Sequence, residues 1–438
     1  MKFFDREEKI EKLQAIRRKS VSEAQFTVIT GRRRVGKTEL VKHAYGDDDF
    51  AYLFVSRKSE FDLVAGFIEE MNRVCPDSIS PEIRTLEAFF KEMFKVSANR
   101  PVTVFIDEFQ ELRRVNPSAF SVLQGIWDRE HGKVKLNLVV CGSINTLMHE
   151  IFMDRKEPLY GRQTAFMRIE PFSIKVLKEI LRFHKKNYKP EDLLALWTFT
   201  GGVAKYVALL MDAGATDFRK MLKAAIDEDS FFLEEGRMLL GDEFGKDYSI
   251  YFSILSAIAR GITSRNDIEQ VVGRQIGGYL TRLEDDYHLV SKRVPFGAKT
   301  TRQIRYQIDD PFYRFWFRFI FKYDYIVQMK SFELLRKLVE RDYPVFGGFA
   351  LERYFHAKMA EDEKWTRIGS WWDRKGENEI DIIAANEIEK EVVFIEVKRN
   401  ATGISLPLLT AKAQSFMRAS GECGDYRSKC IGLSLDDM

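Results

Sequence analysis

The sequence has few cysteines, no long uncharged apolar run and almost no net charge. Its four cysteines show neither a C-x-x-C spacing nor a nearby histidine pair, which argues against a zinc site and against a disulfide framework. No stretch reaches the roughly 18 uncharged apolar residues of a membrane span, and the N-terminus M-K-F-F-D-R-E-E-K-I lacks the apolar core of a signal peptide. We therefore expect a protein of the reducing cytoplasm with no membrane partner.

The charge balance limits the kind of partner. The chain of 438 residues has a net charge of +3, which is too small to indicate a general affinity for polyanions. Any nucleic-acid surface therefore has to be local. The chain is 45% hydrophobic and 31% charged, and its length predicts about two to four domains with sizeable cores.

A phosphate-binding pattern lies near the N-terminus, in T-V-I-T-G-R-R-R-V-G-K-T-E-L from Thr27 to Leu40. This stretch predicts a buried strand, a tight turn and a helix start, and its spacing fits G-x-x-x-x-G-K-[ST]. Backbone N–H groups of such a turn close around phosphates, and the helix N-terminus adds partial positive charge. We expect Lys37 to contact the β/γ-phosphates of ATP and Thr38 to hold Mg²⁺. The residues expected to line the nucleotide are Gly31, Arg32, Arg33, Arg34, Val35, Gly36, Lys37, Thr38 and Glu39.

Two carboxylates follow a second buried strand, expected at residues 102–106. The strand V-T-V-F-I runs directly into Asp107 and Glu108. In a phosphate-loop ATPase, Asp107 would support Mg²⁺ directly or through water, and Glu108 would orient and polarise the attacking water. A strand followed by an acidic loop is the alternative, and the upstream phosphate loop favours the functional interpretation.

Polar residues farther along could complete the ATP site. After a strand expected at 136–141, Ser143 or Asn145 could touch the γ-phosphate or the attacking water, because ligands bind at the carboxyl edge of α/β sheets. A helix N-cap explains either residue equally well. Arg162, in L-Y-G-R-Q-T, stands where an arginine could act on the nucleotide of a neighbouring subunit in a homo-oligomer. A plain surface arginine is the alternative.

The chain changes character after residue 170. Residues 171–240 have helical periodicity, and residues 241–310 predict three helices and a basic hairpin, which is the pattern of a winged helix. The hairpin could contact DNA phosphates, or the winged helix could be a rigid spacer, and both interpretations stay open. The basic residues of the hairpin are Lys292, Arg293, Lys299, Arg302 and Arg305. In the next stretch, P-F-Y-R-F-W-F-R-F-I-F-K, we expect a buried aromatic stripe with a solvated basic face.

A second candidate site lies in residues 311–438. A helix expected at 349–359 contains Glu352, and two strands expected at 379–384 and 392–399 contain Asp381 and then Glu396 with Lys398. Because strand side chains alternate, Glu396 and Lys398 emerge on one face. The order of these elements resembles that of PD-(D/E)XK nucleases, the restriction-endonuclease-like fold. The resemblance implies Mg²⁺ on Asp381 and Glu396, water positioned by Lys398, and Glu352 completing the metal shell. A strand pair with exposed charges is the alternative.

Residues 1 to about 310 resemble the archaeal and bacterial ATPases of the AAA+/STAND group. The resemblance is carried by F-F-D-R-E-E-K-I, G-R-R-R-V-G-K-T, F-I-D-E-F-Q, C-G-S, L-Y-G-R-Q-T, E-P-F and T-G-G. It implies a P-loop NTPase core with a parallel sheet at 1–170, a helical lid at 171–240 and a winged helix at 241–310. Relatives usually have proline where this chain has Ala204, before Lys205, which would be a second sensor. Archaeal-type ATPases often carry the C-terminal α/β nuclease-like module as well.

Two functions fit this organisation. In the first, the protein is an ATPase coupled to a metal-dependent nuclease that acts on nucleic acid, DNA rather than RNA. In the second, it is an ATP-dependent switch or DNA-binding ATPase with a degenerate nuclease fold. The acids and lysine of the D…E-x-K pattern favour the first, and the small net charge leaves the second open.

Overall fold

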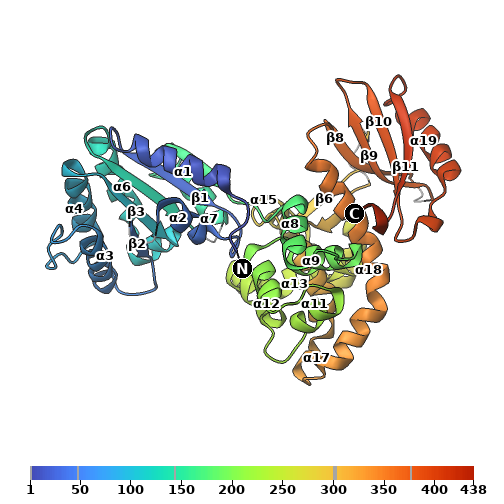
Figure 1. Ribbon diagram of the computed structural model, residues 1–438, viewed down its shortest axis with the longest axis horizontal. Coiled ribbons are helices and arrows are strands. Elements are labelled where there is room, and N and C mark those ends of the chain that lie inside the picture. The colour runs from blue at the N-terminus through green and yellow to red at the C-terminus, as the bar shows by residue number, and fades with distance from the viewer. Residues whose placement is uncertain (1, 47–48, 143–144, 299–302, 375–376) are drawn as a thin grey trace. The chain divides into compact units, whose positions relative to one another are not determined.

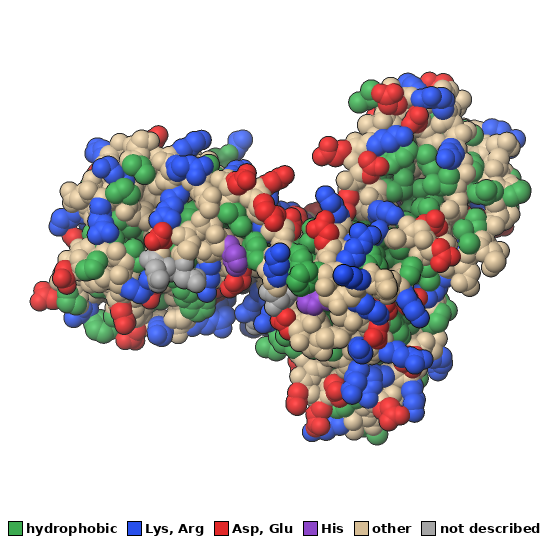
Figure 2. Space-filling view, in the orientation of Figure 1, with side chains coloured by type: hydrophobic (Ala, Val, Ile, Leu, Met, Phe, Trp, Pro, Cys, Tyr) green, Lys and Arg blue, Asp and Glu red, His purple; other side chains and the backbone are tan. Residues whose placement is uncertain are grey.

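The computed structural model describes residues 2–46, 49–142, 145–298, 303–374 and 377–438, and the chain divides into two compact units (Figure 1). One unit spans Phe3–Pro171, and the other is built from Phe172–Met438. Positive and negative side chains are interspersed on the face drawn in Figure 2, as the small net charge leads one to expect. Within the described ranges, no helix combines the length and apolar character needed to cross a membrane.

The N-terminal unit is built on a parallel five-stranded sheet with the order β2-β3-β4-β1-β5. All residues of β3 and β4 are buried, as expected for strands covered on both faces. The strands expected at 102–106 and 136–141 are confirmed, and the first of them extends one residue farther, to Asp107. The strands are β1 (Gln25–Thr30), β2 (Ala51–Phe54), β3 (Val102–Asp107), β4 (Leu136–Cys141) and β5 (Ala165–Arg168).

Helices cover both faces of this sheet and give it two cores. One core gathers apolar side chains of α1 and α2, and a larger one gathers those of α3, α4, α6 and α7. The sheet order brings the carboxyl ends of β1, β3 and β4 to one edge, which is the edge where ligands bind in such folds. The helices are α1 (Glu7–Lys19), α2 (Lys37–Tyr45), α3 (Glu60–Val74), α4 (Leu86–Asn99), α5 (Leu112–Val115), α6 (Ala119–Glu130) and α7 (Asn145–Met153).

The C-terminal unit begins with helices and then forms three helices and a hairpin. The antiparallel pair β6 (Val290–Arg293) and β7 (Arg305–Ile308) follows the third of those helices, as the sequence predicts. The first five helices are α8 (Ile174–His184), α9 (Pro190–Thr200), α10 (Ala204–Asp212), α11 (Phe218–Ala225) and α12 (Phe231–Phe244). The next three are α13 (Tyr248–Ala259), α14 (Arg265–Val272) and α15 (Gly277–Asp285).

The aromatic stretch forms α16 (Pro311–Phe315) and a π-helical turn (Trp316–Ile320). Its rings are buried, as expected, with Trp316 1% exposed. The expectation of a solvated basic face is wrong for Arg314 and Arg318, which are half-buried and line a cavity. After α17 (Asp324–Gln328), helix α18 (Phe332–Ala360) runs for 29 residues and contains Pro344.

The chain ends in a four-stranded sheet with the order β11-β10-β9-β8. The first three strands in sequence form an antiparallel meander, and β11 then pairs in parallel with β10 after the helix α19. Phe394 and Phe416 meet in the core between this sheet and α19. The elements are β8 (Arg367–Trp372), β9 (Glu379–Asn386), β10 (Glu391–Val397), α19 (Leu406–Ser420) and β11 (Arg427–Leu433).

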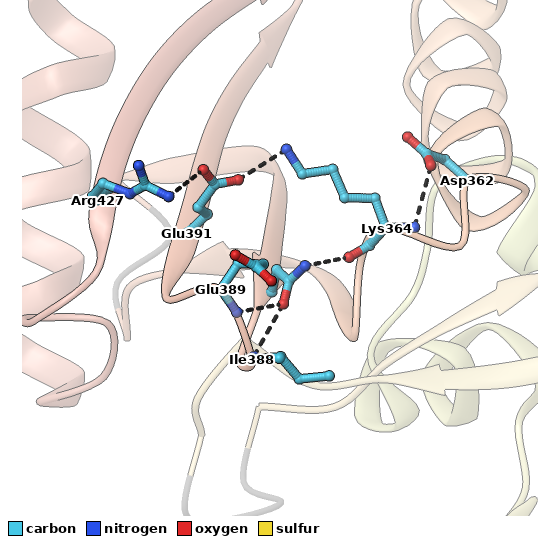
Figure 3. Close-up of polar contacts among 7 residues, drawn as sticks. Asp362, Lys364, Ile388, Glu389, Glu391 and Arg427 are labelled. Atoms are coloured by element: carbon cyan, nitrogen blue, oxygen red, sulfur yellow. Dashed lines mark hydrogen bonds and ion pairs between the residues drawn. The ribbon is translucent and has the colours of Figure 1, made fainter.

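A polar cluster fixes the turn between β9 and β10 (Figure 3). Asn386 Oδ1 accepts hydrogen bonds from the N–H groups of Ile388 and Glu389, and its Nδ2 donates to the Lys364 carbonyl at 2.8 Å. Glu391 forms ion pairs with Lys364 at 2.9 Å and Arg427 at 2.8 Å. These contacts hold the register of the two strands that carry the candidate nuclease residues at their other ends.

Candidate functional site

The phosphate loop connects β1 to α2 in a conformation that needs its glycines. Gly31 has φ +141°, and a Cβ there would lie 2.3 Å from the carbonyl oxygen of Ile169. Gly36 precedes α2 with φ +92°. Lys37 is buried, and its ammonium donates to the carbonyls of Gly31 at 2.8 Å and Arg32 at 3.1 Å. The lysine is therefore held against the loop that is expected to surround the phosphates.

Asp107, at the end of β3, accepts hydrogen bonds from two neighbouring strands, from α2 and from the residue that follows β3. Its Oδ2 accepts from the Thr38 hydroxyl at 2.9 Å and from the Tyr52 hydroxyl at 3.0 Å. Its Oδ1 accepts from Cys141 Sγ at 2.8 Å and from the Glu108 N–H at 2.9 Å. Burial, together with Asp107, raises the pKa of Tyr52 and of Cys141, so both stay protonated and donate.

This arrangement fits the cation that the motif implies. A hydroxyl and a carboxylate oxygen stand side by side at Thr38 and Asp107, and oxygen ligands of this kind suit Mg²⁺. Burial lowers the pKa of Lys37, opposed by Cys141, Glu108 and Asp107. Tyr52 and Cys141 were not predicted as partners of Asp107, because only the sheet order brings them to that residue.

Glu108 lies directly after β3 in the left-handed region, with φ +54°. A side chain other than glycine in this region costs roughly 1–3 kcal/mol, and such outliers cluster at functional sites. Gln110 Nε2 donates to Glu108 Oε2 at 2.6 Å and so helps to orient the carboxylate. Gly142 allows this approach, since a Cβ there would lie 2.2 Å from Gln110 Oε1. Sequence reasoning missed Gln110, although it stands within the F-I-D-E-F-Q stretch.

The other residues expected at the ATP site make contacts that do not by themselves indicate nucleotide binding, or lie outside the described residues. Val35 is buried in the core beside Leu40, so its side chain supports the loop. Glu39 lies 3.9 Å from Lys42 in an ion pair on α2. Ser143 lies outside the described residues. Arg162 pairs with Asp128 at 3.2 Å within its own unit, and its role toward a neighbouring subunit stays a prediction.

Gly31→Ala is expected to destabilise the N-terminal unit and weaken ATP binding, because the new Cβ would overlap the Ile169 carbonyl. Overpacking of this kind costs about 1–3 kcal/mol, and each kcal/mol lowers the melting temperature by about 2–4 °C in a domain of this size. Gly46→Ala is the matched control, since Gly46 has φ +79° but a Cβ there meets nothing within 4 Å. Equal melting temperatures for the two variants would contradict the close approach.

The second candidate site lies on adjacent strands of the last sheet. Ile395 of β10 pairs with Ile382 of β9, and the same register places Glu396 opposite Asp381. Lys398 Nζ lies 3.3 Å from Glu396 Oε1 and 3.6 Å from Asp381 Oδ2. The ammonium therefore bridges the two carboxylates. The three residues that the D…E-x-K pattern singles out do come together.

Further contacts fix these acids. The Val397 N–H donates to Asp381 Oδ2 at 2.8 Å, and Lys412 of α19 lies 4.0 Å from Glu396 Oε1. Sequence reasoning missed Lys412, because only the packing of α19 brings it near. Glu396 Oε2 is buried and accepts no hydrogen bond from any residue that the structure describes, so it has capacity for a further partner.

Electrostatics link Glu352 of α18 to the strand acids. Burial raises the pKa of Glu352 to about 8, with added repulsion from Asp381 and Glu379. Burial also raises the pKa of Asp381, although the hydrogen bond from the Val397 N–H acts in the opposite direction. Burial lowers the pKa of Lys398, but Asp381 and Glu396 outweigh this and hold it above its usual value. Glu352 and Asp381 both line a cavity of about 120 Å³.

The complete set of ligands expected from the sequence is not assembled. Across the described ranges, no group of three or more His, Cys, Asp or Glu residues is placed to hold a metal ion. Asp381 and Glu396 meet through Lys398, while Glu352 lines the neighbouring cavity. Two strand carboxylates with an unused, buried oxygen fit a divalent cation that keeps several water ligands.

The basic hairpin contacts the last sheet. Arg293 donates to the Ser370 hydroxyl at 2.7 Å, and Arg305 pairs with Glu379 at 2.9 Å and lies 4.2 Å from the centre of the Trp372 ring. Lys292 pairs with Glu284, and Lys299 and Arg302 lie outside the described residues. The ion pairs of Lys292 and Arg305 with acidic residues favour a spacer role for the three helices and the hairpin over DNA-phosphate binding by these two side chains.

Two family profiles match parts of the chain. Residues 3–210 match an ATPase domain predominantly from Archaea, and residues 316–408 match archaeal and bacterial proteins of unknown function. An uncharacterized protein of Methanocaldococcus jannaschii is 31% identical over 408 residues, which are 90% of this chain and 87% of that protein.

One solved structure shows a similar fold, and a second aligns less well. The Walker-type ATPase of Pyrococcus abyssi aligns with a TM-score of 0.54 and 20% identity, covering 72% of this chain and 96% of that one. The ORC2 protein of Aeropyrum pernix aligns with a TM-score of 0.48 and 14% identity, covering 74% of this chain and 94% of that one. The first likeness shows a shared fold over 72% of this chain.

Proposed function

This chain belongs to the family of the Methanocaldococcus jannaschii protein and carries the ATPase domain found predominantly in Archaea, and on that premise we propose an ATP-hydrolysing enzyme coupled to a metal-dependent nuclease. The family and the fold give the ATPase domain. The nuclease is the finer part of the proposal. It is carried by one observation, the Lys398 ammonium held between Asp381 and Glu396.

At the first site, different residues have separate roles in the transfer of a phosphate group to water. Lys37 offsets charge on the β/γ-phosphates, and the loop N–H groups at the start of α2 hold the phosphates in place. Thr38 and Asp107 would hold Mg²⁺, which supplies further charge neutralisation at the phosphates. Glu108, oriented by Gln110, accepts a hydrogen bond from the attacking water.

At the second site, Asp381 and Glu396 would hold a divalent cation that polarises water and the phosphodiester. Lys398 then donates to the attacking water or to the phosphate from the same face of the sheet. The order of elements supports this interpretation, since α18, the meander β8-β9-β10, α19 and the parallel strand β11 follow the order expected of a PD-(D/E)XK domain. We further propose that DNA is the nucleic acid and that Arg162 acts between subunits of a homo-oligomer.

One incubation series tests the proposal. Purified full-length protein is incubated with duplex DNA, single-stranded DNA or RNA, with Mg²⁺ or Mn²⁺, and with or without ATP. We expect metal-dependent cleavage of DNA and ATP hydrolysis in the same preparation. ATP hydrolysis without cleavage under any condition would replace the nuclease with an ATP-dependent switch. That alternative is favoured by Arg305 of the hairpin, which pairs with Glu379 of β9 instead of standing free for DNA.

A further inference from the structure

A cavity of about 500 Å³ lies within the C-terminal unit, between the β6–β7 hairpin, α16 and α18. Six arginines and two glutamates line it, a formal excess of four positive charges, whereas the whole chain carries +3. The charged residues are Arg260, Arg293, Arg305, Arg314, Arg318, Arg353, Glu352 and Glu379. The cavity therefore has a local excess of positive charge that the small net charge of the chain does not reveal. Such an excess favours an anion as the ligand.

Among these guanidinium groups, those of Arg293 and Arg314 have no ion pair with an acidic side chain of the described residues, whereas Arg305 and Arg318 pair with Glu379 and Asp342. The Arg314 backbone N–H donates to the Asp310 carbonyl, but its guanidinium has no hydrogen bond or ion pair with any described residue and lies 5.9 Å from the ring centres of Phe346 and Phe349. Arg293 donates to the neutral hydroxyl of Ser370. Arg353 donates to the Gln307 side chain and lies 3.6 Å from Asp309. The charges in the cavity are therefore only partly offset by the protein itself.

Burying and clustering these guanidinium groups changes their pKa values. Burial, with repulsion from neighbouring guanidinium groups, lowers the pKa of Arg293, Arg314 and Arg353 to about 10. All three remain charged at neutral pH. Clustered, partly dehydrated cations are unfavourable unless an anion joins them, and the planar guanidinium suits two oxygens of one phosphate.

The opening adds an apolar surface to this charged interior. Val345 is 69% exposed and Phe349 is 53% exposed, and both line the cavity together with Phe346 and Tyr306. The volume lies within the roughly 300–1,000 Å³ of sites for small ligands. A ligand that complements both the arginine-lined interior and the apolar surface carries a phosphate and a flat group with apolar faces.

We propose that this cavity binds a nucleoside phosphate, with the phosphate on Arg293, Arg314 and Arg353 and the base against Phe349. The ligand is either a free nucleotide or the terminal nucleotide of a nucleic-acid strand, because both present the same chemistry. The cavity shares Arg293, Glu352 and Arg353 with the smaller cavity that Asp381 lines. The proposal stands whether or not Asp381 takes part in cleavage, since it concerns binding alone.

The test uses the full-length Lys37→Ala variant, in which the phosphate loop is impaired. Its binding to AMP, inorganic phosphate and 5′-phosphorylated or 5′-hydroxyl single-stranded DNA is measured by calorimetry without a divalent cation. We expect AMP or the 5′-phosphorylated strand to bind, and Arg314→Gln to weaken that binding about tenfold, as expected for a lost charge-assisted hydrogen bond. Arg427→Gln, which removes an exposed arginine paired with Glu391 on the same unit, should leave it unchanged.

Each outcome decides one part of the proposal. Binding of AMP identifies a free nucleotide as sufficient, and binding of the 5′-phosphorylated strand alone identifies a strand end. Inorganic phosphate that binds as well as AMP would overturn the nucleoside assignment. No binding by any probe, or equal weakening by Arg314→Gln and Arg427→Gln, would overturn the site. Failure of DNA cleavage with this binding intact would reject only the nuclease, so the two proposals fail separately.

Discussion

Lys37→Ala is expected to abolish tight ATP binding, whereas Glu108→Gln is expected to bind ATP and lose turnover. The two substitutions remove different functions from one site. Lys37 is held on the loop carbonyls of Gly31 and Arg32, where its charge meets the phosphates, and each lost charge-assisted hydrogen bond costs roughly 1.5–3 kcal/mol. Glu108 sits past β3 and acts on water, so its loss should slow hydrolysis about 10²–10⁴-fold.

Equilibrium binding of labelled ATP and steady-state phosphate release measure the two effects. Lys42→Ala is the matched control, because Lys42 lies on the same helix α2 and pairs only loosely with Glu39, at 3.9 Å. It should bind and hydrolyse ATP as the wild type does. Wild-type affinity in Lys37→Ala would reject the assignment of the phosphate loop, and wild-type turnover in Glu108→Gln would reject the water-orienting role.

The ATP site could be predicted from the sequence because its main parts are local. The turn from β1 into α2 requires Gly31 and Gly36 at fixed spacing, and the run of buried residues in β3 ends at Asp107. Parallel strands bring such ends to one edge, which is why Thr38 and Asp107 meet at 2.9 Å. Cys141 could not be predicted as a partner of Asp107, since its contact depends on β4 lying next to β3.

Prediction was incomplete where distant segments pack together. The helix expected at residues 349–359 is confirmed as the end of α18, which begins at Phe332 and continues through Pro344. Proline normally interrupts a helix, but buried Tyr343 and Phe346 flank it and keep the chain packed. Arg314 was expected in solvent because its spacing gives a helical face, and only the packing of α16 against α18 shows that this face closes a cavity.

The helix α18 also shows why single residues are ambiguous signals of secondary structure. Gly347 on its own predicts a break in the helix. In the structure a Cβ there would lie 2.3 Å from Arg399 Nη1, so the glycine makes room for that arginine. Arg399 in turn pairs with Glu191 of α9 and joins the end of β10 to the helical part of the unit. The glycine serves a contact between residues far apart in the sequence, which no periodicity reveals.

Asp381→Asn and Lys398→Ala are each expected to remove nucleic-acid cleavage and to leave ATP hydrolysis close to wild type. Asparagine keeps the shape of Asp381 and can still accept the Val397 N–H, so the strand pairing survives while one negative charge is lost. Without that charge, Glu396 alone cannot hold the cation, which contributes several kcal/mol to such reactions, so cleavage should fall at least about a hundredfold. Lys398→Ala leaves the two carboxylates facing each other without the ammonium that bridges them.

Cleavage of labelled DNA with Mn²⁺ and phosphate release from ATP are measured on the same preparations. Glu389→Gln is the control, because Glu389 is exposed at the β9–β10 turn of the same sheet (Figure 3). Lys398 pairs with carboxylates that are only 14% and 9% exposed, so a purely structural role for Lys398 predicts a lower melting temperature in Lys398→Ala with cleavage close to wild type in the folded protein. If Asp381→Asn cleaves as fast as Glu389→Gln, the strand acids serve the fold, and any nuclease activity of the preparation belongs elsewhere. Parallel loss of ATP hydrolysis would instead mean that the substitution disturbs the ATPase unit, which contains neither Asp381 nor Lys398.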